Sequence, residues 1–519
     1  MQTLHFNDAF LQALPGDPVT SNHPRQIQEA IYAYVSPTPV KAPTLVAYSS
    51  EAAVLIGLND TDCTSDQFLQ TFAGNSQLPG MQPHATCYGG HQFGNWAGQL
   101  GDGRAINLGE VGTPQDHWML QLKGAGPTPF SRTADGLAVM RSSVREFLCS
   151  EAMFHLGVPT TRALSLIGTG EAVLRDMLYD GNAAYEPGAV VCRMSRSFIR
   201  FGHYQMLAAR NELDLLRDLT NFVIDHDFPH LKHLSDTNER IITWFNEVCT
   251  RTAELMAHWM RVGFVHGVMN TDNMSILGET IDYGPYGWLE DFDQDWTPNT
   301  TDASQRRYRY GQQPAIGQWN LLQLANAVLP LLGDAKGLEV GLSTYAQHYE
   351  QTWQMMMAAK LGLQKYDKKV VDQLMALLTA AETDMTLFYR NLMSAAPLEP
   401  ACTAALTDAY YQPNQLTDAL LNQQRQWLER YAATLKEQQV SESTRRATMQ
   451  HTNPKFVLRN YLAQLAIDDA HKGDFGGVKA LLDVLRHPYD EQPGREAYAQ
   501  KRPEWARTKV GCSMLSCSS

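Results

Sequence analysis

Hydrophobic and polar positions divide the chain into a strand-rich stretch followed by a helical one. Between residues 81 and 195, short apolar runs alternate with glycines and other turn residues, a pattern typical of strands. After residue 205, apolar residues recur at helical spacing, most clearly over residues 239–262. The pattern therefore predicts a β-rich lobe that precedes a helical lobe.

Individual elements follow from the same periodicity. Residues 136–156 have apolar positions at helical spacing, and Gly157 followed by Pro159 is a typical helix end. We expect another helix over residues 21–34 and further helices from Gln318 onward. The expected strands are residues 118–123, 162–167, 172–175 and 189–194, with a small hairpin made by residues 275–277 and 280–281.

The expected elements follow the layout of a two-lobed protein kinase. This layout has a glycine-rich β region, a crossing helix, a strand pair and a large helical region. We therefore predict an α+β, kinase-like fold with an N-terminal extension and a largely helical C-terminal region. Its expected parts are the extension (residues 1–80), an N-lobe (81–195), a C-lobe with the catalytic loop and metal site (196–395) and a helical C-terminal region with a redox tail (396–519).

Composition narrows the class of protein. The 519 residues carry a formal net charge of −13, which argues against a nucleic-acid-binding protein. No apolar run is long enough to span a membrane, and the N-terminal residues lack the features of a signal peptide. We expect a monomeric, cytoplasmic protein of bacterial type. The 8 cysteines lack zinc-site spacing, and we expect all but the terminal Cys512 and Cys517 to be buried and inert.

Two polar residues after the long predicted helix have the spacing of kinase metal ligands. Asn273 lies seven residues after His266, and Asp282 opens an Asp-Tyr-Gly turn nine residues later. Their carboxamide and carboxylate oxygens suit Mg²⁺ or Mn²⁺, because these cations prefer hard oxygen ligands. Either residue alone is also an ordinary turn former, but the ordered pair favours a metal site.

Upstream residues agree with a nucleotide site. Lys123 ends a predicted strand, where a kinase lysine reaches the phosphates, and Glu146 in the following helix is placed to pair with it. The alternative for both residues is an ordinary surface charge. Gly101, Gly103 and Arg104 belong to a glycine-rich run whose amides could cradle phosphate, although its spacing differs from the full kinase loop.

The catalytic base of a kinase is missing. An active protein kinase has an aspartate two residues after the catalytic-loop histidine, and here Val268 occupies that position. Because a valine side chain accepts no proton, two interpretations remain. The chain is either a catalytically dead scaffold or an enzyme that uses ATP and metal for a different reaction.

Four long segments of the chain resemble the selenoprotein O family of kinase-like AMP transferases, also known as the YdiU family. They are residues 91–104, 121–132, 266–273 and 309–321, and the resemblance extends over most of the chain. It implies that ATP binds in reverse relative to a kinase, with the γ-phosphate buried and the α-phosphate offered to a Ser, Thr or Tyr hydroxyl of a protein substrate. Mg²⁺ or Mn²⁺ is the implied cofactor.

The resemblance also implies roles for single residues. Asp272 matches the proton acceptor, with a loop-stabilising or outer metal-site role as the alternative. Lys123 matches the ATP lysine, while Asn273 and Asp282 match the metal ligands. The other residues that match nucleotide contacts are Gly101, Gly103, Arg104, Asp135, Gly136, Arg193 and Arg200. The two arginines match those on the buried phosphates, whereas without the resemblance a surface salt bridge is the simpler interpretation of them.

The tail carries a further implication of the resemblance. Cys517 is the antepenultimate residue, a position that holds selenocysteine or cysteine in the family. The resemblance suggests a redox gate at this residue, with Cys512 or a distant thiol as its partner, and a tail without function is the alternative. Three functions therefore remain in view: AMP transfer to protein hydroxyls, phosphoryl transfer by an atypical kinase that uses Asp272, and ATP binding by a non-catalytic pseudokinase.

Overall fold

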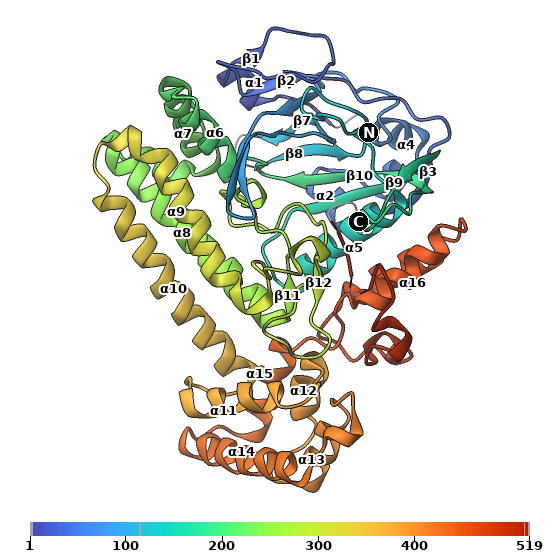
Figure 1. Ribbon diagram of the computed structural model, residues 1–519, viewed down its shortest axis with the longest axis vertical. Coiled ribbons are helices and arrows are strands. Elements are labelled where there is room, and N and C mark those ends of the chain that lie inside the picture. The colour runs from blue at the N-terminus through green and yellow to red at the C-terminus, as the bar shows by residue number, and fades with distance from the viewer. Residues whose placement is uncertain (1–3, 114–115, 513, 517–519) are drawn as a thin grey trace.

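The computed structural model describes residues 4–113, 116–512 and 514–516. It consists of a lobe built on a large sheet and a lobe of long helices, with a further group of helices below them (Figure 1). This arrangement confirms the predicted kinase-like α+β fold. None of the helices within the described ranges combines the length and hydropathy of a membrane span.

The sheet of the first lobe is mostly antiparallel. Its spatial order over the described residues is β1-β2-β4-β7-β8-β10-β9-β3, and only the pair β1–β2 is parallel. The strands are β1 (Gly16–Asp17), β2 (Tyr32–Tyr34), β3 (Thr44–Tyr48), β4 (His84–Thr86), β7 (Ala105–Thr113), β8 (Asp116–Lys123), β9 (Arg162–Arg175) and β10 (Ala184–Ser195). A separate hairpin is formed by β5 (Gly89–Gln92) and β6 (Asn95–Gln99).

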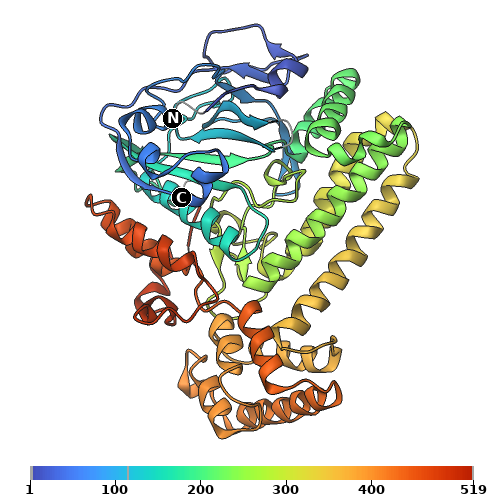
Figure 2. The same ribbon diagram turned by 180° about the vertical axis from the view of Figure 1, so that it is seen from behind.

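Residues before position 81 complete this sheet at both edges. β1 and β2 extend it beyond β4, whereas β3 pairs with β9 at the other edge. Short helices join these strands and cover the sheet: α1 (Ala9–Ala13), α2 (Ser50–Leu55), α3 (Asp60–Cys63) and α4 (Asp66–Phe72). The N-terminal segment therefore wraps around the lobe, as both views show (Figures 1 and 2).

The register of the central strands sets the floor of the site. Arg193 of β10 lies directly opposite Gln121 of β8, and Lys123 is two residues further along β8. Because side chains alternate between the faces of a strand, Gln121 and Lys123 point to the same side of the sheet. The helix α5 (Met140–His155) packs on β9 and β10 and is buried over most of its length. Leu156 is its C-cap, and Gly157 follows with φ of +71°, as the sequence predicts.

Long helices form the second lobe. α8 (Thr237–Val262) packs against α9 (Gln313–Leu332) and α10 (Lys336–Lys360), and the three run side by side in Figure 1. α6 (Phe201–Ala209) and α7 (Leu213–Asp227) connect this lobe to the sheet. The loop between α8 and α9 contains the short strands β11 (Phe264–Val265) and β12 (Gly287–Trp288) and the 3-10 turn η2 (Thr271–Asn273).

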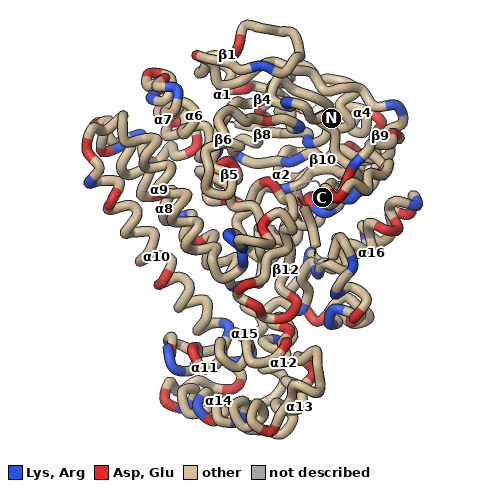
Figure 3. The backbone as a smooth tube through the Cα atoms, viewed as in Figure 1, with Lys and Arg blue, Asp and Glu red and all other residues tan. Residues whose placement is uncertain are grey.

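The C-terminal helices divide into two groups. The first shares an apolar core with the end of α10 and the loop between α8 and α9. It consists of α11 (Lys368–Thr379), α12 (Met385–Leu392), α13 (Pro400–Thr407), α14 (Asp418–Glu437) and α15 (Glu442–Thr452). The second, α16 (Asn460–Ala470) and α17 (Gly476–Leu485), returns to pack on α5 of the sheet lobe. Acidic and basic residues are mixed along α11–α14 rather than separated by sign (Figure 3).

Three sequence-based expectations are wrong. Residues 21–34 form a loop that ends in β2 instead of a helix, because distant groups satisfy its backbone: Arg25 N donates to Pro129 O and Ile27 N to Gln99 Oε1. Residues 275–277 and 280–281 do not pair with each other, since Ser275 bridges Arg200 and Thr280 bridges Thr160. Cys512, expected to be exposed, is 1% exposed.

Candidate active site

A cavity of about 660 Å³ lies between the sheet lobe and the loop that connects α8 to α9. This volume is within the usual range for a small-molecule site. The sequence-predicted residues that line it are Gly101, Gly103, Arg104, Lys123, Asp135, Gly136, Arg193, Asp272, Asn273 and Asp282. The remaining two in the described chain, Glu146 and Arg200, lie behind this wall and contact residues in it. Tertiary structure therefore brings together residues that are far apart in the sequence.

Lys123 and Glu146 form a buried ion pair. The Lys123 Nζ lies 2.5 Å from Glu146 Oε2, and the two residues are 7% and 1% exposed. Burial lowers the pKa of Lys123 to about 8, and the facing Glu146 carboxylate only partly offsets this effect. The interpretation of these residues as surface charges is therefore wrong.

Arg193 connects the same glutamate to the metal-ligand candidate. Its Nη1 lies 2.9 Å from Glu146 Oε1 and 2.6 Å from Asp282 Oδ1. Its Nε donates to Gln121 Oε1 at 3.0 Å, across the β8–β10 register. A guanidinium held by three acceptors is fixed in place, and at 2% exposure it is no surface salt bridge. Gln121 was not singled out from the sequence, although its position two residues before Lys123 on one strand face could have indicated it.

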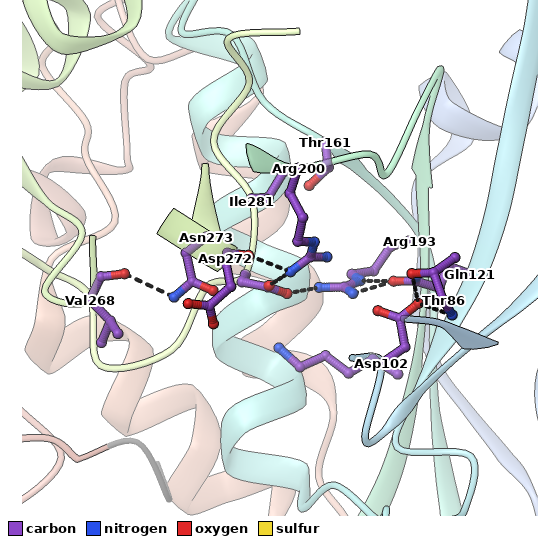
Figure 4. A network of polar contacts seen from close by, with 12 residues as sticks. Thr86, Asp102, Gln121, Thr161, Arg193, Arg200, Val268, Asp272, Asn273 and Ile281 are labelled. Carbon is purple, nitrogen blue, oxygen red and sulfur yellow. Dashed lines mark hydrogen bonds and ion pairs between the residues drawn. The ribbon is translucent and has the colours of Figure 1, made fainter. Parts of the chain in front are cut away.

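Arg200 approaches Asp282 from the other side. Its Nη1 donates to Asp282 Oδ2 and, at 2.9 Å, to the backbone oxygen of Asp272. Its guanidinium carbon lies 4.6 Å from the centre of the Tyr88 ring. Figure 4 shows the two arginines reaching the same carboxylate from different elements. Tyr88, which also lines the cavity, is a second residue that the sequence did not indicate.

These contacts leave an excess of positive charge at the floor of the cavity. Burial acts to raise the pKa of Asp282, but Arg200, Arg193 and Lys123 outweigh it and hold that pKa well below its ordinary value. Asp282 and Glu146 are thus two carboxylates among three buried cations. Such a site attracts an anion of high charge, such as a polyphosphate.

The loop from His266 to Asn273 is held by buried hydrogen bonds. His266 Nε2 lies 2.8 Å from Ile281 O, and its backbone N–H donates to Gln313 Oε1 at 2.9 Å. Gln313 and Asn320 of α9 also donate to Phe264 O and Met269 O. Gln313 and Asn320 therefore anchor this loop to α9.

Asn273 and Asp282 have the chemistry to hold a divalent cation. The Asn273 Nδ2 donates to Val268 O at 2.9 Å, which directs the amide oxygen away from that carbonyl (Figure 4). Each oxygen of Asp282 already accepts from an arginine, but a carboxylate oxygen has a second lone pair for a metal ion. Hard oxygen donors of this kind fit Mg²⁺ or Mn²⁺.

Asp272 is a buried carboxylate beside this cation cluster. It is 7% exposed, and burial raises its pKa to about 6. Gln92 Nε2 donates to its Oδ2 at 3.3 Å, whereas its Oδ1 has no hydrogen-bond partner among the described residues. A Cβ added at Gly90 would lie 2.3 Å from this Oδ1. The β5–β6 hairpin therefore leaves space for an unpaired oxygen, a feature that the sequence did not reveal.

The glycine-rich segment before β7 is fixed against the cavity. Asp102 Oδ2 accepts from Thr86 N at 2.9 Å and from Thr86 Oγ1 at 2.6 Å, and Thr128 Oγ1 donates to Asp102 O at 2.7 Å. Gly101 has φ of +119°, and a Cβ there would lie 2.6 Å from the ring of Phe130. Only glycine fits this position.

Asp135 and Gly136 lie at the rim. Asp135 forms an ion pair with Arg175 at 2.7 Å, and its side chain is 45% exposed. Gly136 has φ of +70°, and a Cβ there would lie 2.2 Å from Gly126 O. Cys517 lies outside the described residues. Cys512 is buried, and burial raises the pKa of its thiol to about 11, which disfavours the reactive thiolate.

The chain is similar to known proteins over almost its whole length. Residues 20–486 match the family model described as "Protein adenylyltransferase SelO". A relative from Azoarcus sp. (strain BH72), named protein nucleotidyltransferase YdiU, is 58% identical over 523 residues and is covered in full, as is this chain. Proteins of the same name from Xanthomonas axonopodis pv. citri (strain 306) and Rhodopirellula baltica are 56% and 55% identical, with 100% and 99% of each chain covered.

Proposed function

Because the chain belongs to the SelO family and is a protein nucleotidyltransferase, we propose that it transfers AMP from ATP to Ser, Thr or Tyr hydroxyls of proteins with ATP bound in the reverse orientation to that in a kinase. The proposal depends on one observation, which is that the candidate catalytic base lies at a different position from that in a kinase. Val268 replaces the kinase aspartate, while Asp272 places an unpaired carboxylate oxygen beside the cation cluster.

The reverse orientation is supported by the depth of the arginines. Arg193 and Arg200 are 2% and 1% exposed, so a phosphate that reaches them is buried behind Lys123 and Asp282. In this orientation the γ-phosphate lies deepest and the α-phosphate faces the cavity opening. Gly101, Gly103 and Arg104 border the remainder of the nucleotide, and Asp135 and Gly136 contact it at the rim.

The chemistry is an in-line substitution at the α-phosphorus. A protein hydroxyl oxygen forms a bond to the α-phosphorus, the bond from that phosphorus to the bridging oxygen breaks, and pyrophosphate leaves. Asp272 accepts the hydroxyl proton, for which a pKa of about 6 suits a base at neutral pH. Lys123 stabilises the charge that develops on the leaving group. Asn273 and Asp282 would hold Mg²⁺ or Mn²⁺, which supplies further neutralisation of phosphate charge when bound.

Labelled ATP tests the proposal directly. The protein and an acceptor protein are incubated with α-labelled ATP and, separately, with γ-labelled ATP, and the label retained on protein is measured. We expect retention only from the α position, and Asp272→Asn should reduce it by about 100-fold or more. Label from the γ position alone would establish an atypical kinase instead. No label from either position would leave an ATP-binding scaffold.

A further inference from the structure

A second group of titratable side chains lies at the far end of β7 and β8 from the cavity. Glu110 belongs to β7 and His117 to β8, whereas His226 and Asp227 end helix α7. Since β8 runs from here to Lys123, the group lies roughly 20 Å along the strand from the nucleotide site. The group joins the sheet lobe to the helical lobe, because α7 packs on α8 and α9 of the helical lobe.

The donor atoms of this group are close enough to share one ion. One ligand atom each from Glu110, His117 and His226 lies within 4.8 Å of the other two. His226 Nε2 is 3.2 Å from Glu110 Oε2, and the centres of the two imidazole rings are 4.0 Å apart. Ligands of a tetrahedral zinc ion are separated by about 3.3 Å, given metal–ligand bonds of about 2.0 Å. The His226–Glu110 separation already matches this value.

Asp227 is placed to orient His226 and lies near His117. Its Oδ1 lies 3.0 Å from His226 Nδ1 and 3.6 Å from His117 Nε2. With the ring proton on Nδ1 and donated to Asp227, Nε2 is the nitrogen available to an ion shared with Glu110. A carboxylate behind a metal-binding histidine is the usual outer partner in zinc sites.

Two buried groups have unmet bonding capacity. His117 is 3% exposed, and neither of its ring nitrogens has a hydrogen-bond partner in the part of the chain that the structure describes. The same holds for Asp227 Oδ2. Unpaired buried polar atoms are costly, and a metal bond to His117 would satisfy one of its two ring nitrogens. A cavity of about 30 Å³ borders Glu110, His226 and Asp227, which is enough for a water molecule as a further ligand.

The surrounding charges favour a cation. Glu110 and Asp227 face His226, and Asp8 lies beside His84 at 3.8 Å near the same cavity. Arg196 also borders this cavity, but Asp116 pairs with it at 2.7 Å. Two carboxylates therefore contact His226, whereas His117 has no hydrogen-bond partner among the described residues.

We propose that Glu110, His117 and His226 bind one Zn²⁺ ion, which fastens the β7–β8 hairpin of the sheet lobe to the end of α7. Two imidazoles and a carboxylate are a donor set that suits zinc. In a second group of similar composition, Glu51, Glu151 and His155, both carboxylates already pair with arginines, so their charge is balanced without an ion. Arg486 Nε lies 2.8 Å from Glu51 Oε1, and Arg162 Nη2 lies 2.7 Å from Glu151 Oε2.

Zinc titration of the full-length protein tests this site. The protein is stripped with a chelator, and Zn²⁺ is added in competition with a colorimetric zinc indicator. We expect one tight equivalent, with affinity reduced by at least about 10-fold in Asp227→Asn and lost in His117→Phe and His226→Phe. His230→Ala, at an exposed histidine, and Asp282→Asn, in the nucleotide cavity, should keep it. Circular dichroism checks that each variant is folded.

Anomalous scattering from wild-type crystals grown with Zn²⁺ provides a test that needs no variant. At the zinc absorption edge we expect a peak between the side chains of Glu110, His117 and His226. The proposal is overturned if this peak is absent, if the histidine variants bind zinc as the wild type does, or if the tight equivalent disappears in Asp282→Asn. The last result would place the ion in the nucleotide cavity.

Discussion

The carboxylate of Asp282 accepts from Arg193 and Arg200 while it faces the cavity. It therefore has two tasks at the residue scale. One is to offer oxygen to a divalent cation, and the other is to balance two guanidinium groups that are almost completely buried. The second task was not apparent from the sequence, because the arginines lie more than 80 positions away.

Replacement of Asp282 should affect both activity and stability. In Asp282→Ala we expect transfer of α-label to fall by at least about 100-fold, because the metal ligand is lost. We also expect the free energy of unfolding to fall by about 3 kcal/mol, since the arginines lose a buried partner. Asp295→Asn, at a 66% exposed ion pair, is the control and should change neither. Unchanged labelling in Asp282→Ala would remove this residue from the site.

Gly90 provides a test of Asp272 that leaves the carboxylate intact. Gly90→Ala introduces a methyl group within 2.3 Å of Asp272 Oδ1 and must displace that side chain. We expect a loss of transfer on the order of 100-fold, because a misplaced catalytic group is ineffective, with little change in ATP affinity. Asn95→Ala, at an exposed position in the same hairpin, is the control. Equal rates in the two variants would argue against Asp272 as the base.

At the scale of elements, strand register and helix contacts place the site. The pairing of β8 with β10 aligns Gln121 with Arg193. The helix α5, which packs on the sheet, contributes Glu146. Buried side chains also join elements elsewhere. Glu290, which follows β12, accepts from the backbone N–H of Asn460 at the start of α16, while its Oε2 is buried without a partner among the described residues.

The Glu290 contact should make stability depend on pH. Burial raises the pKa of Glu290 to about 7, with Asp384 adding to this and Arg459 and Arg502 opposing it. The folded protein therefore holds this proton more tightly than the unfolded chain, so the contribution is favourable at low pH and is lost as pH rises toward 7. In Glu290→Gln we expect a gain of about 1–3 kcal/mol over wild type at pH 8 and a much smaller gain at pH 5.

Urea unfolding at the two pH values measures this difference. The exposed Glu437→Gln in α14 serves as the control, and its effect should be the same at both values. A Glu290→Gln effect that is equal at pH 5 and pH 8 would show that burial does not shift this group.

At the scale of the whole molecule, the C-terminal residues return to the catalytic lobe. Leu515 N donates to Pro298 O at 2.9 Å, and Thr300 N donates to Leu515 O at 2.7 Å. Between these residues, Asn299 Nδ2 donates to Gly267 O of the catalytic loop at 3.0 Å. The tail thus braces the segment that supports this loop.

Removal of residues 510–519 tests this brace. We expect a lower melting temperature and a several-fold slower transfer, because the segment around Asn299 loses its backbone partner. Full-length Cys517→Ala keeps the bracing backbone and, under reducing conditions, should match the wild type in both measurements. If the truncated protein also matches the wild type under reducing conditions, the tail does not brace this segment.

The sequence by itself determined the lobes, the residue types at the site and the family. Helical periodicity located α5 and α8, motif spacing selected Lys123, Asn273 and Asp282, and the family resemblance added Asp272. These features are local, so they can be recognised without a fold. The same local reasoning failed for residues 21–34, whose backbone bonds go to partners far along the chain.

Only the tertiary structure decided how the selected residues act together. The double pairing of Asp282, the unpaired oxygen of Asp272 above Gly90 and the meeting of His117 with His226 all join distant segments. Each depends on strand register, helix packing and burial, which also set the pKa values of Lys123 and Asp272. Motif spacing specifies which groups are present. Their protonation states, and which of their atoms lack a hydrogen-bond partner, depend on the neighbours that folding places around them.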